Sequence, residues 1–202
     1  MERYSPLLRR IDGMLGLYPR VLVAIDGDAA AGKSTLGAFL KSQYDCNLFH
    51  MDDFFLQPWQ RTEAREKEPG GNVDYERFRQ EVLVPTLEGR AFSYRPFCCE
   101  RGALGEEIAV KPQKLNVVEG SYSLHPTLAA AYQIKVFLAV EEEVQRRRIT
   151  ARNGEEGARP FFETWIPKEK WYFLHFDIEN HCDFIDKYGI MEERTDFTDK
   201  RS

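Results

Sequence analysis

The chain has 202 residues, of which 43% are hydrophobic and 30% are charged, and its formal net charge is −5. This length and composition fit one well-buried domain of a soluble globular protein. The negative net charge argues against a protein that binds along a nucleic-acid backbone, because such proteins present a basic surface.

No apolar run reaches the length of a membrane span, and the first residues lack the apolar core of a signal peptide. The spacing of Cys46, Cys98, Cys99 and Cys182 fits neither a zinc site nor a disulfide framework. We therefore expect a cytoplasmic protein with reduced thiols, a small-molecule substrate, and neither nucleic acid nor a membrane as partner. The sequence leaves a homo-oligomer open.

In chain order, apolar runs alternate with helical patterns, which favours an α/β fold with a parallel sheet and helices on both faces. Strands are expected at residues 20–26, 46–51, 115–118, 134–140 and 182–185. Helices are expected to begin near residues 5, 33, 75, 141 and 167. Residues 91–97 and 107–112 are expected to pair as a small β-hairpin. We expect one domain over residues 1–190 and a polar, disordered tail over 191–202.

The clearest motif follows the first predicted strand and matches G-x-x-x-x-G-K-[ST] in full: Gly27-Asp28-Ala29-Ala30-Ala31-Gly32-Lys33-Ser34-Thr35. Its glycines let backbone N–H groups approach phosphate oxygens, and the helix that follows presents its positive end to the same oxygens. Lys33 is expected to reach the terminal phosphates and Ser34 to ligate Mg²⁺. A chance match would occur in roughly one chain in a hundred, and the flanking strand and helix reduce that further. The motif predicts binding of ATP and Mg²⁺.

Three acidic residues, Asp52, Asp53 and Glu119, follow or end predicted strands, where open α/β sheets bind their ligands. Phosphoryl transfer needs one carboxylate that holds Mg²⁺ and another that accepts the proton of the attacking hydroxyl. Either strand end could supply either role. Asp52 and Asp53 cannot both point the same way, because side chains alternate along a strand. Each acid could instead begin a loop or cap a turn.

The charged helix expected at residues 141–152 carries four arginines and ends at a glycine turn. Two of the arginines have a glutamate four residues earlier, and such pairs commonly stabilise the exposed surface of a helix. Arg148 and Arg152 have no such partner, and this indicates an anion clamp on a mobile lid over about residues 148–166. The alternative is that they stabilise the carboxyl end of the helix.

Three further residues have two interpretations each. Asp74 is placed to cap a helix, or to accept hydrogen bonds from sugar hydroxyls. Tyr94 and Phe97 could stack on a base, or pack in the core, which is the more frequent role of aromatic residues on a hairpin.

The ordered set of motifs resembles the uridine kinase and nicotinamide riboside kinase group of P-loop kinases over about residues 20–185. The motifs are the phosphate loop, Asp52-Asp53-Phe54-Phe55, Asp74-Tyr75-Glu76-Arg77-Phe78, the segment around Tyr94, Val118-Glu119-Gly120 and Arg146-Arg147-Arg148. The resemblance implies a three-layer P-loop fold with about five parallel strands, helices on both faces, a small β-hairpin and a lid.

The resemblance also implies roles for individual residues. Asp52, the first acid of its run, looks like the catalytic base, and Ser34 and Glu119 look like the Mg²⁺ ligands. Asp74 looks like the residue that holds the ribose hydroxyls, and Tyr94 looks like a wall of the nucleoside pocket. Two lid arginines, Arg148 and Arg152, would act on the phosphates together with Lys33.

Two segments depart from the family pattern. Uridine kinases have a histidine shortly after the pocket tyrosine, whereas residues 95–100 contain none. The lid reads Arg152-Asn153-Gly154 where the family has Arg-Gly-Arg.

The expected activity is transfer of the γ-phosphoryl group of ATP to a hydroxyl of a nucleoside-like metabolite. A kinase for another small alcohol such as pantothenate, and a nucleotide-binding regulatory protein without catalysis, remain alternatives.

Overall fold

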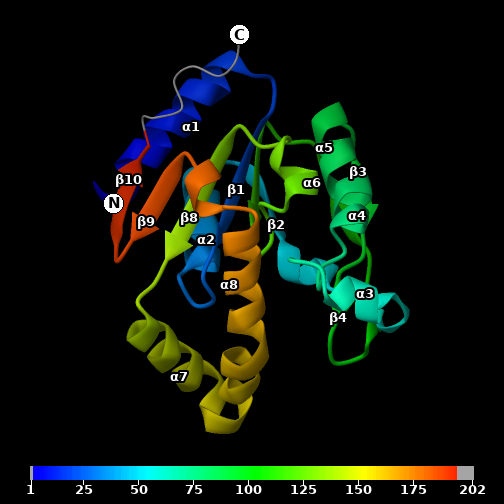
Figure 1. Ribbon diagram of the computed structural model, residues 1–202. Coiled ribbons are helices and arrows are strands. Elements are labelled where there is room, and N and C mark those ends of the chain that lie inside the picture. Colours follow the sequence, from blue (N-terminus) through cyan, green and yellow to red (C-terminus); the bar gives the residue numbers. More distant parts are fainter. Residues whose placement is uncertain (1, 195–202) are drawn as a thin grey trace.

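A six-stranded sheet in the order β10-β9-β8-β1-β7-β2 forms the centre of the computed structural model, which describes residues 2–194 (Figure 1). The strands are β1 (Val21–Gly27), β2 (Cys46–His50), β7 (Leu115–Glu119), β8 (Ile134–Ala139), β9 (Phe184–Lys187) and β10 (Ile190–Glu193). All neighbouring strands are parallel except β9 and β10, which are antiparallel. The predicted α/β fold is therefore confirmed, with one antiparallel edge strand added to five parallel ones.

The edge strand β10 arises from a two-residue turn, Tyr188-Gly189. Both residues have positive φ, 57° and 92°, which is the backbone conformation that joins antiparallel strands most tightly. Residues 191–193, predicted to begin the disordered tail, instead pair with β9. Residues 195–202 of that predicted tail lie outside the described residues.

Each face of the sheet has its own apolar core, because side chains along β1 alternate between the two faces. Val23 and Ile25 pack on the face covered by two helices near the N-terminus. Ala24 lies on the opposite face, where Phe78 and Tyr172 are fully buried. The helices of the first face are α1 (Ser5–Leu17) and α2 (Lys33–Gln43), and those of the second include α4 (Tyr75–Phe78), α6 (Pro126–Ala129) and α8 (Ile166–His175). This is the predicted arrangement of helices on both faces.

Two helical segments contain a wide π-helical turn. One runs from α4 into α5 (Val84–Glu88), and the other from α7 (Glu142–Pro160) into α8. In both, a proline, Pro85 or Pro167, is the second residue of the helix that follows. Because proline lacks an N–H and crowds the carbonyl four residues earlier, the preceding turn widens to accommodate it.

Gly154 interrupts α7 with φ 71° and ψ 172°, as the sequence predicted. The prediction missed that the chain resumes a helix after Gly154 and continues into α8. Figure 1 shows α7 and the start of α8 projecting beyond the sheet, at the end where β8 leads into α7. The segment predicted as a lid, about residues 148–166, is therefore helical: it comprises most of α7, the π-helical turn after it and the start of α8.

The remaining elements lie beside β2. The predicted hairpin is confirmed, since β3 (Phe92–Tyr94) pairs with β6 (Ile108–Val110). At its tip a second hairpin joins β4 (Phe97–Cys98) and β5 (Ala103–Leu104), and a short helix, α3 (Glu63–Glu66), lies nearby. Within residues 2–194, no helix has both the length and the apolar character that crossing a membrane requires.

One buried carboxylate, that of Asp26, connects three elements behind the phosphate loop. It has no solvent exposure and accepts hydrogen bonds from the N–H groups of Gly27, Tyr122 and Leu124, and from the Tyr172 hydroxyl. Burial raises the pKa of Asp26, while the bonds from Leu124, Gly27 and Tyr172 and the charge of Lys33 oppose the shift. The end of β1, the loop after β7 and α8 therefore depend on the same side chain.

We expect Tyr172→Phe to lower the free energy of unfolding by about 1–3 kcal/mol, because it removes one donor from the buried Asp26 carboxylate and keeps the ring. Urea unfolding followed by circular dichroism measures the change. Tyr188→Phe is the matched control, since this tyrosine is 68% exposed and should change stability by less than about 0.5 kcal/mol. Equal effects of the two substitutions would show that the Asp26 bond contributes nothing.

Candidate active site

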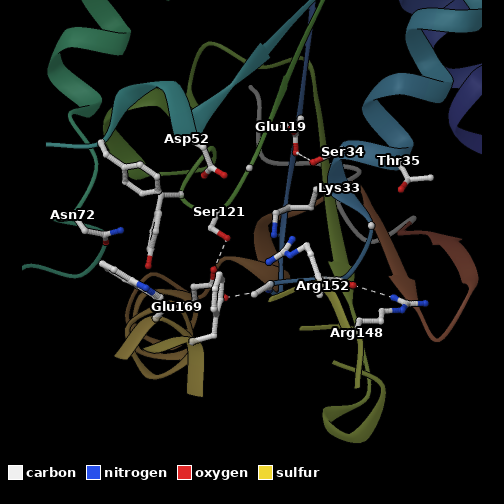
Figure 2. Close-up of a pocket in the computed structure, with 18 of the residues that line it drawn as sticks. Lys33, Ser34, Thr35, Asp52, Asn72, Glu119, Ser121, Arg148, Arg152 and Glu169 are labelled. Atoms are coloured by element: carbon white, nitrogen blue, oxygen red, sulfur yellow. Dashed lines mark hydrogen bonds between the residues drawn. The ribbon is translucent and has the colours of Figure 1, made fainter. Parts of the chain in front are cut away.

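A cavity of about 560 Å³ lies at the carboxyl ends of β1, β2 and β7 (Figure 2). This size is typical of small-molecule sites, and this edge of an open α/β sheet is where such sites form. The residues that line it include Ala29, Ala30, Gly32, Lys33, Ser34, Thr35, Asp52, Asn72, Glu119, Ser121, Arg148, Arg152 and Glu169. The cavity therefore brings together six residues of the predicted phosphate loop and four predicted site residues from elsewhere.

The phosphate loop connects β1 to α2, as the motif requires, and it is fastened to β8. Gly27 has φ +134°, and a Cβ atom there would lie 2.1 Å from the carbonyl oxygen of Leu138. The N–H of Asp28 donates to the same carbonyl, and its carboxylate accepts from the N–H of Val140. Gly27 and Asp28 thus shape the loop without lining the cavity, and Ala31 lines a second cavity that adjoins the loop.

Lys33 is nearly buried at 9% exposure and directs its ammonium group at the loop itself. Its Nζ donates to the carbonyl oxygens of Gly27 at 2.6 Å and Asp28 at 2.8 Å. The positive charge of Lys33 is therefore enclosed by the phosphate loop, and Lys33 is also one of the residues that line the cavity.

Ser34 and Glu119 meet at the cavity floor. The Ser34 hydroxyl donates to Glu119 Oε2 at 3.2 Å, and Glu119 Oε1 lies 2.6 Å from His50 Nδ1. The hydrogen bond with Glu119 raises the pKa of His50. The two residues predicted as Mg²⁺ ligands are thus adjacent, although 85 positions separate them in sequence.

Asp52 lines the cavity and Asp53 does not. After β2 the chain enters a 3₁₀ turn, Met51–Phe54, which turns the two carboxylates apart, and Asp53 accepts a hydrogen bond from the Tyr94 hydroxyl. Solvent reaches Asp52 through the cavity, yet the surrounding protein still desolvates it enough to raise the pKa of its carboxyl group. Lys33 opposes that rise.

Both predicted lid arginines reach the cavity. The Arg148 guanidinium donates to the carbonyl oxygen of Ala30 at 2.9 Å, and that of Arg152 lies 5.4 Å from the centre of the Phe161 ring. The second cavity, of about 780 Å³, is lined by Arg147 and by Tyr188, and it shares Ala30 and Arg148 with the first. Both cavities therefore adjoin the phosphate loop and share part of their lining.

Three predicted substrate contacts lie away from the cavity lining. Asp74 is 4% exposed and accepts from the N–H of Arg77 and from Gln60 Nε2. Tyr94 and Phe97 are 5% and 6% exposed, so neither ring offers a free face to a base. In this structure Asp74 has the contacts of a helix cap, and Tyr94 and Phe97 have the burial of core rings, which are the alternatives that the sequence left open. The predicted contacts of these three residues with a substrate stay predictions.

Sequence reasoning missed Glu169, which α8 carries into the cavity. Its Oε1 accepts from the Ser121 hydroxyl at 2.6 Å, and its Oε2 accepts from the N–H of Ala29 in the phosphate loop at 3.0 Å. Burial raises the pKa of Glu169, and Lys33 opposes the rise. One signal was available: Glu169 lies three residues after Ile166 and three before Tyr172, on the buried stripe of its helix.

Comparison with known proteins places this site in a known fold. No protein-family model matches the chain, and no curated protein sequence matches it either. Among solved structures, a possible uridine kinase from Bacillus stearothermophilus superimposes with a TM-score of 0.66 at 16% identity, over 91% of this chain and 100% of that one. A protein from a Silicibacter species, proposed as a fructose transport system kinase, superimposes with a TM-score of 0.63 at 24% identity. The superposition covers 83% of this chain and 90% of that one.

A third structure, that of a protein from Saccharomyces cerevisiae proposed as a circularly permuted P-loop kinase, gives a TM-score of 0.54 at 14% identity, over 92% of this chain and 96% of that one. At these identities the likeness concerns the fold. The chain has the fold of the uridine-kinase-like P-loop kinases, as the ordered motifs implied.

We expect Gly27→Ala to destabilise the protein more than Gly32→Ala. Both glycines have positive φ, so each substitution costs about 1–2 kcal/mol of backbone strain. A Cβ at Gly32 meets nothing within 4 Å, whereas one at Gly27 collides with the Leu138 backbone. Unfolding free energies from denaturant titration measure the difference. Equal losses would show that the loop can separate from β8 at no cost.

Proposed function

We propose that this chain is an ATP-dependent small-molecule kinase that transfers the γ-phosphoryl group of Mg-ATP to a hydroxyl of a nucleoside or nucleoside-like metabolite. One observation carries the proposal: a single cavity is lined by the phosphate loop, the Ser34 and Glu119 pair, Asp52 and two arginines. These groups come from four separate parts of the chain and correspond to the parts that phosphoryl transfer requires.

The phosphates of ATP would bind to the loop. Its backbone N–H groups and the amino end of α2 supply partial positive charge, and Lys33, Arg148 and Arg152 supply full charges. The second cavity adjoins the loop and is large enough for the nucleoside part of ATP. Lys33 would exchange its carbonyl partners for phosphate oxygens, which are stronger acceptors because they are charged.

The Ser34 and Glu119 pair fits Mg²⁺. A hydroxyl and a carboxylate are hard oxygen donors, and Mg²⁺ in kinases takes one or two protein ligands and completes its shell with phosphate oxygens and water. Consistently, the described part of the chain contains no group of three or more acidic, histidine or cysteine side chains that would hold a metal unaided. When bound, Mg²⁺ neutralises charge that develops on the phosphoryl oxygens.

Asp52 is the group placed to act on the acceptor. It lines the cavity, and its carboxylate has no hydrogen-bond donor assigned to it among residues 2–194, so its oxygens are open to a ligand. In the proposed reaction the acceptor oxygen bonds to the γ-phosphorus, ADP leaves with the electrons of the broken P–O bond, and Asp52 accepts the hydroxyl proton. Lys33 and the lid arginines stabilise the charge on the transferred group.

We expect Asp52→Asn to lower kcat by about 10²–10⁴-fold while ATP affinity changes little, because the amide cannot accept the proton. Asp53→Asn is the matched control: it keeps the bond from Tyr94 and should retain turnover within about threefold. Stopped assays of ADP release and calorimetry with ATP measure the two effects. Near-normal turnover of Asp52→Asn would refute its assignment as the base.

The wild-type pH profile tests the same assignment. Because Asp52 must be ionised to act, kcat/KM should fall as the pH is lowered through its pKa, which desolvation sets above the ordinary aspartate value. If the acidic side of the profile gave a pKa at or below the ordinary aspartate value, that result would contradict the desolvation of this carboxylate.

The experiment that decides the function is an acceptor panel. Purified protein is given Mg-ATP with uridine, cytidine, nicotinamide riboside or pantothenate, and ADP release is measured with and without each acceptor. We expect release to depend strictly on an acceptor. Tight ATP binding with no acceptor-dependent release from any of them would favour a regulatory nucleotide-binding protein.

A further inference from the structure

The charges that line the cavity are divided between its two sides. Figure 2 shows Lys33, Arg148 and Arg152 on one side, with Asp52, Asn72, Ser121 and Glu169 on the other. The first side faces the phosphate loop, where ATP is proposed to bind. The second side is left for the acceptor and carries two carboxylates, an amide and a hydroxyl, with no basic side chain among them.

Glu169 is the most constrained of these groups. It is 7% exposed, and its carboxylate accepts from two neutral donors, the Ala29 N–H and the Ser121 hydroxyl. Among residues 2–194, no lysine, arginine or histidine side chain forms an ion pair with it. A carboxylate has about four lone-pair positions, so about two remain for a ligand.

The carboxylate is also held rigidly. It is fixed at one oxygen by the phosphate loop and at the other by Ser121, two residues beyond Glu119, and its backbone lies in α8. A group positioned from three elements keeps its direction when a ligand enters, which is what selective recognition needs.

We propose that Glu169 selects the acceptor by charge: together with Asp52 it makes the acceptor side anionic, so that the enzyme takes hydroxyl compounds that are neutral or cationic and rejects those that carry a carboxylate or phosphate. This inference rests on the proposed kinase function. It assigns a role to a residue outside the phosphate loop, the Mg²⁺ pair and the lid arginines.

The physical basis is repulsion in a partly desolvated space. Two like charges about 4 Å apart repel far more strongly near protein than in bulk water, because the effective dielectric constant is lower. An anionic acceptor would meet two carboxylates, which is discrimination by an unfavourable contact. The charge of Lys33 acts on both carboxylates, but its ammonium group points at the carbonyl oxygens of the loop and is proposed to pair with the phosphates of ATP. A cationic acceptor gains instead, both from the carboxylates and from the rings of Phe55, Tyr122 and Trp165, which line the same cavity.

Matched pairs of acceptors test the proposal, each pair differing by one carboxylate on the same scaffold. The pairs are uridine and orotidine, nicotinamide riboside and nicotinic acid riboside, and panthenol and pantothenate. In every pair of which the protein phosphorylates at least one member, we expect the member without the carboxylate to have a kcat/KM at least about tenfold higher. Calorimetry with a non-hydrolysable ATP analogue measures binding of the same pairs independently of phosphoryl transfer.

Glu169→Gln removes the charge and keeps the shape and the capacity to bond to Ala29 and Ser121. In this variant we expect the preference within each pair to shrink to about threefold or less, mainly through the acceptor KM, while ATP affinity stays within about twofold. Glu163→Gln is the control, because Glu163 lies in the π-helical turn that leads into α8, pairs with Arg159 and is largely exposed. It should leave the preference unchanged, and thermal unfolding confirms that both variants fold.

The outcomes separate this inference from the proposed function. If no acceptor supports ADP release but the carboxylate-free members still bind better, the kinase assignment fails and the charge selection stands. Equal or better binding and use of the anionic members would overturn the inference while leaving a kinase. A Glu169→Gln variant that loses ATP affinity but keeps the wild-type acceptor preference would show that Glu169 only positions the loop.

Discussion

The close approach of Gly27 to the end of β8 is the constraint on which the site depends. Only a residue without Cβ fits against the Leu138 carbonyl at that φ, and the Asp28 carboxylate then fastens the loop to the N–H of Val140. Because β8 leads directly into α7, the helix that carries the lid arginines starts beside the phosphate loop. The contact between Arg148 and the Ala30 carbonyl follows from that proximity.

A single loop residue, Ala29, joins the phosphate loop to both α7 and α8. Its carbonyl oxygen accepts from Gln145 on α7, its N–H donates to Glu169 on α8, and its methyl group packs in a small apolar cluster with Ile149 and Ile166. A shift of either helix therefore changes the surroundings of a loop amide. This arrangement connects the segment predicted as a lid directly to the loop that is proposed to hold the phosphates.

The same arrangement separates charges of opposite sign within one cavity. The cations come from α2 and α7, while the acidic groups of the side proposed for the acceptor come from the turn after β2 and from α8. Neither set is contiguous in sequence, and the division exists because the sheet aligns the strand ends and because α7 and α8 bring their side chains to the same cavity. Asp74, Tyr94 and Phe97 are excluded from it, since the hairpin and the capped helix bury them beside β2 instead.

The sequence by itself determined the strand–loop–helix unit, the parallel sheet and the placement of Asp52 and Glu119 at strand ends. Those features depend on local backbone preferences, on short-range apolar patterns and on the rule that parallel strands end at one edge. Only the tertiary structure decided that Asp52 rather than Asp53 faces the cavity, that β10 joins the sheet, and that Glu169 touches the loop 140 residues away in sequence. Long-range packing and desolvation decide such matters, and no local pattern encodes them.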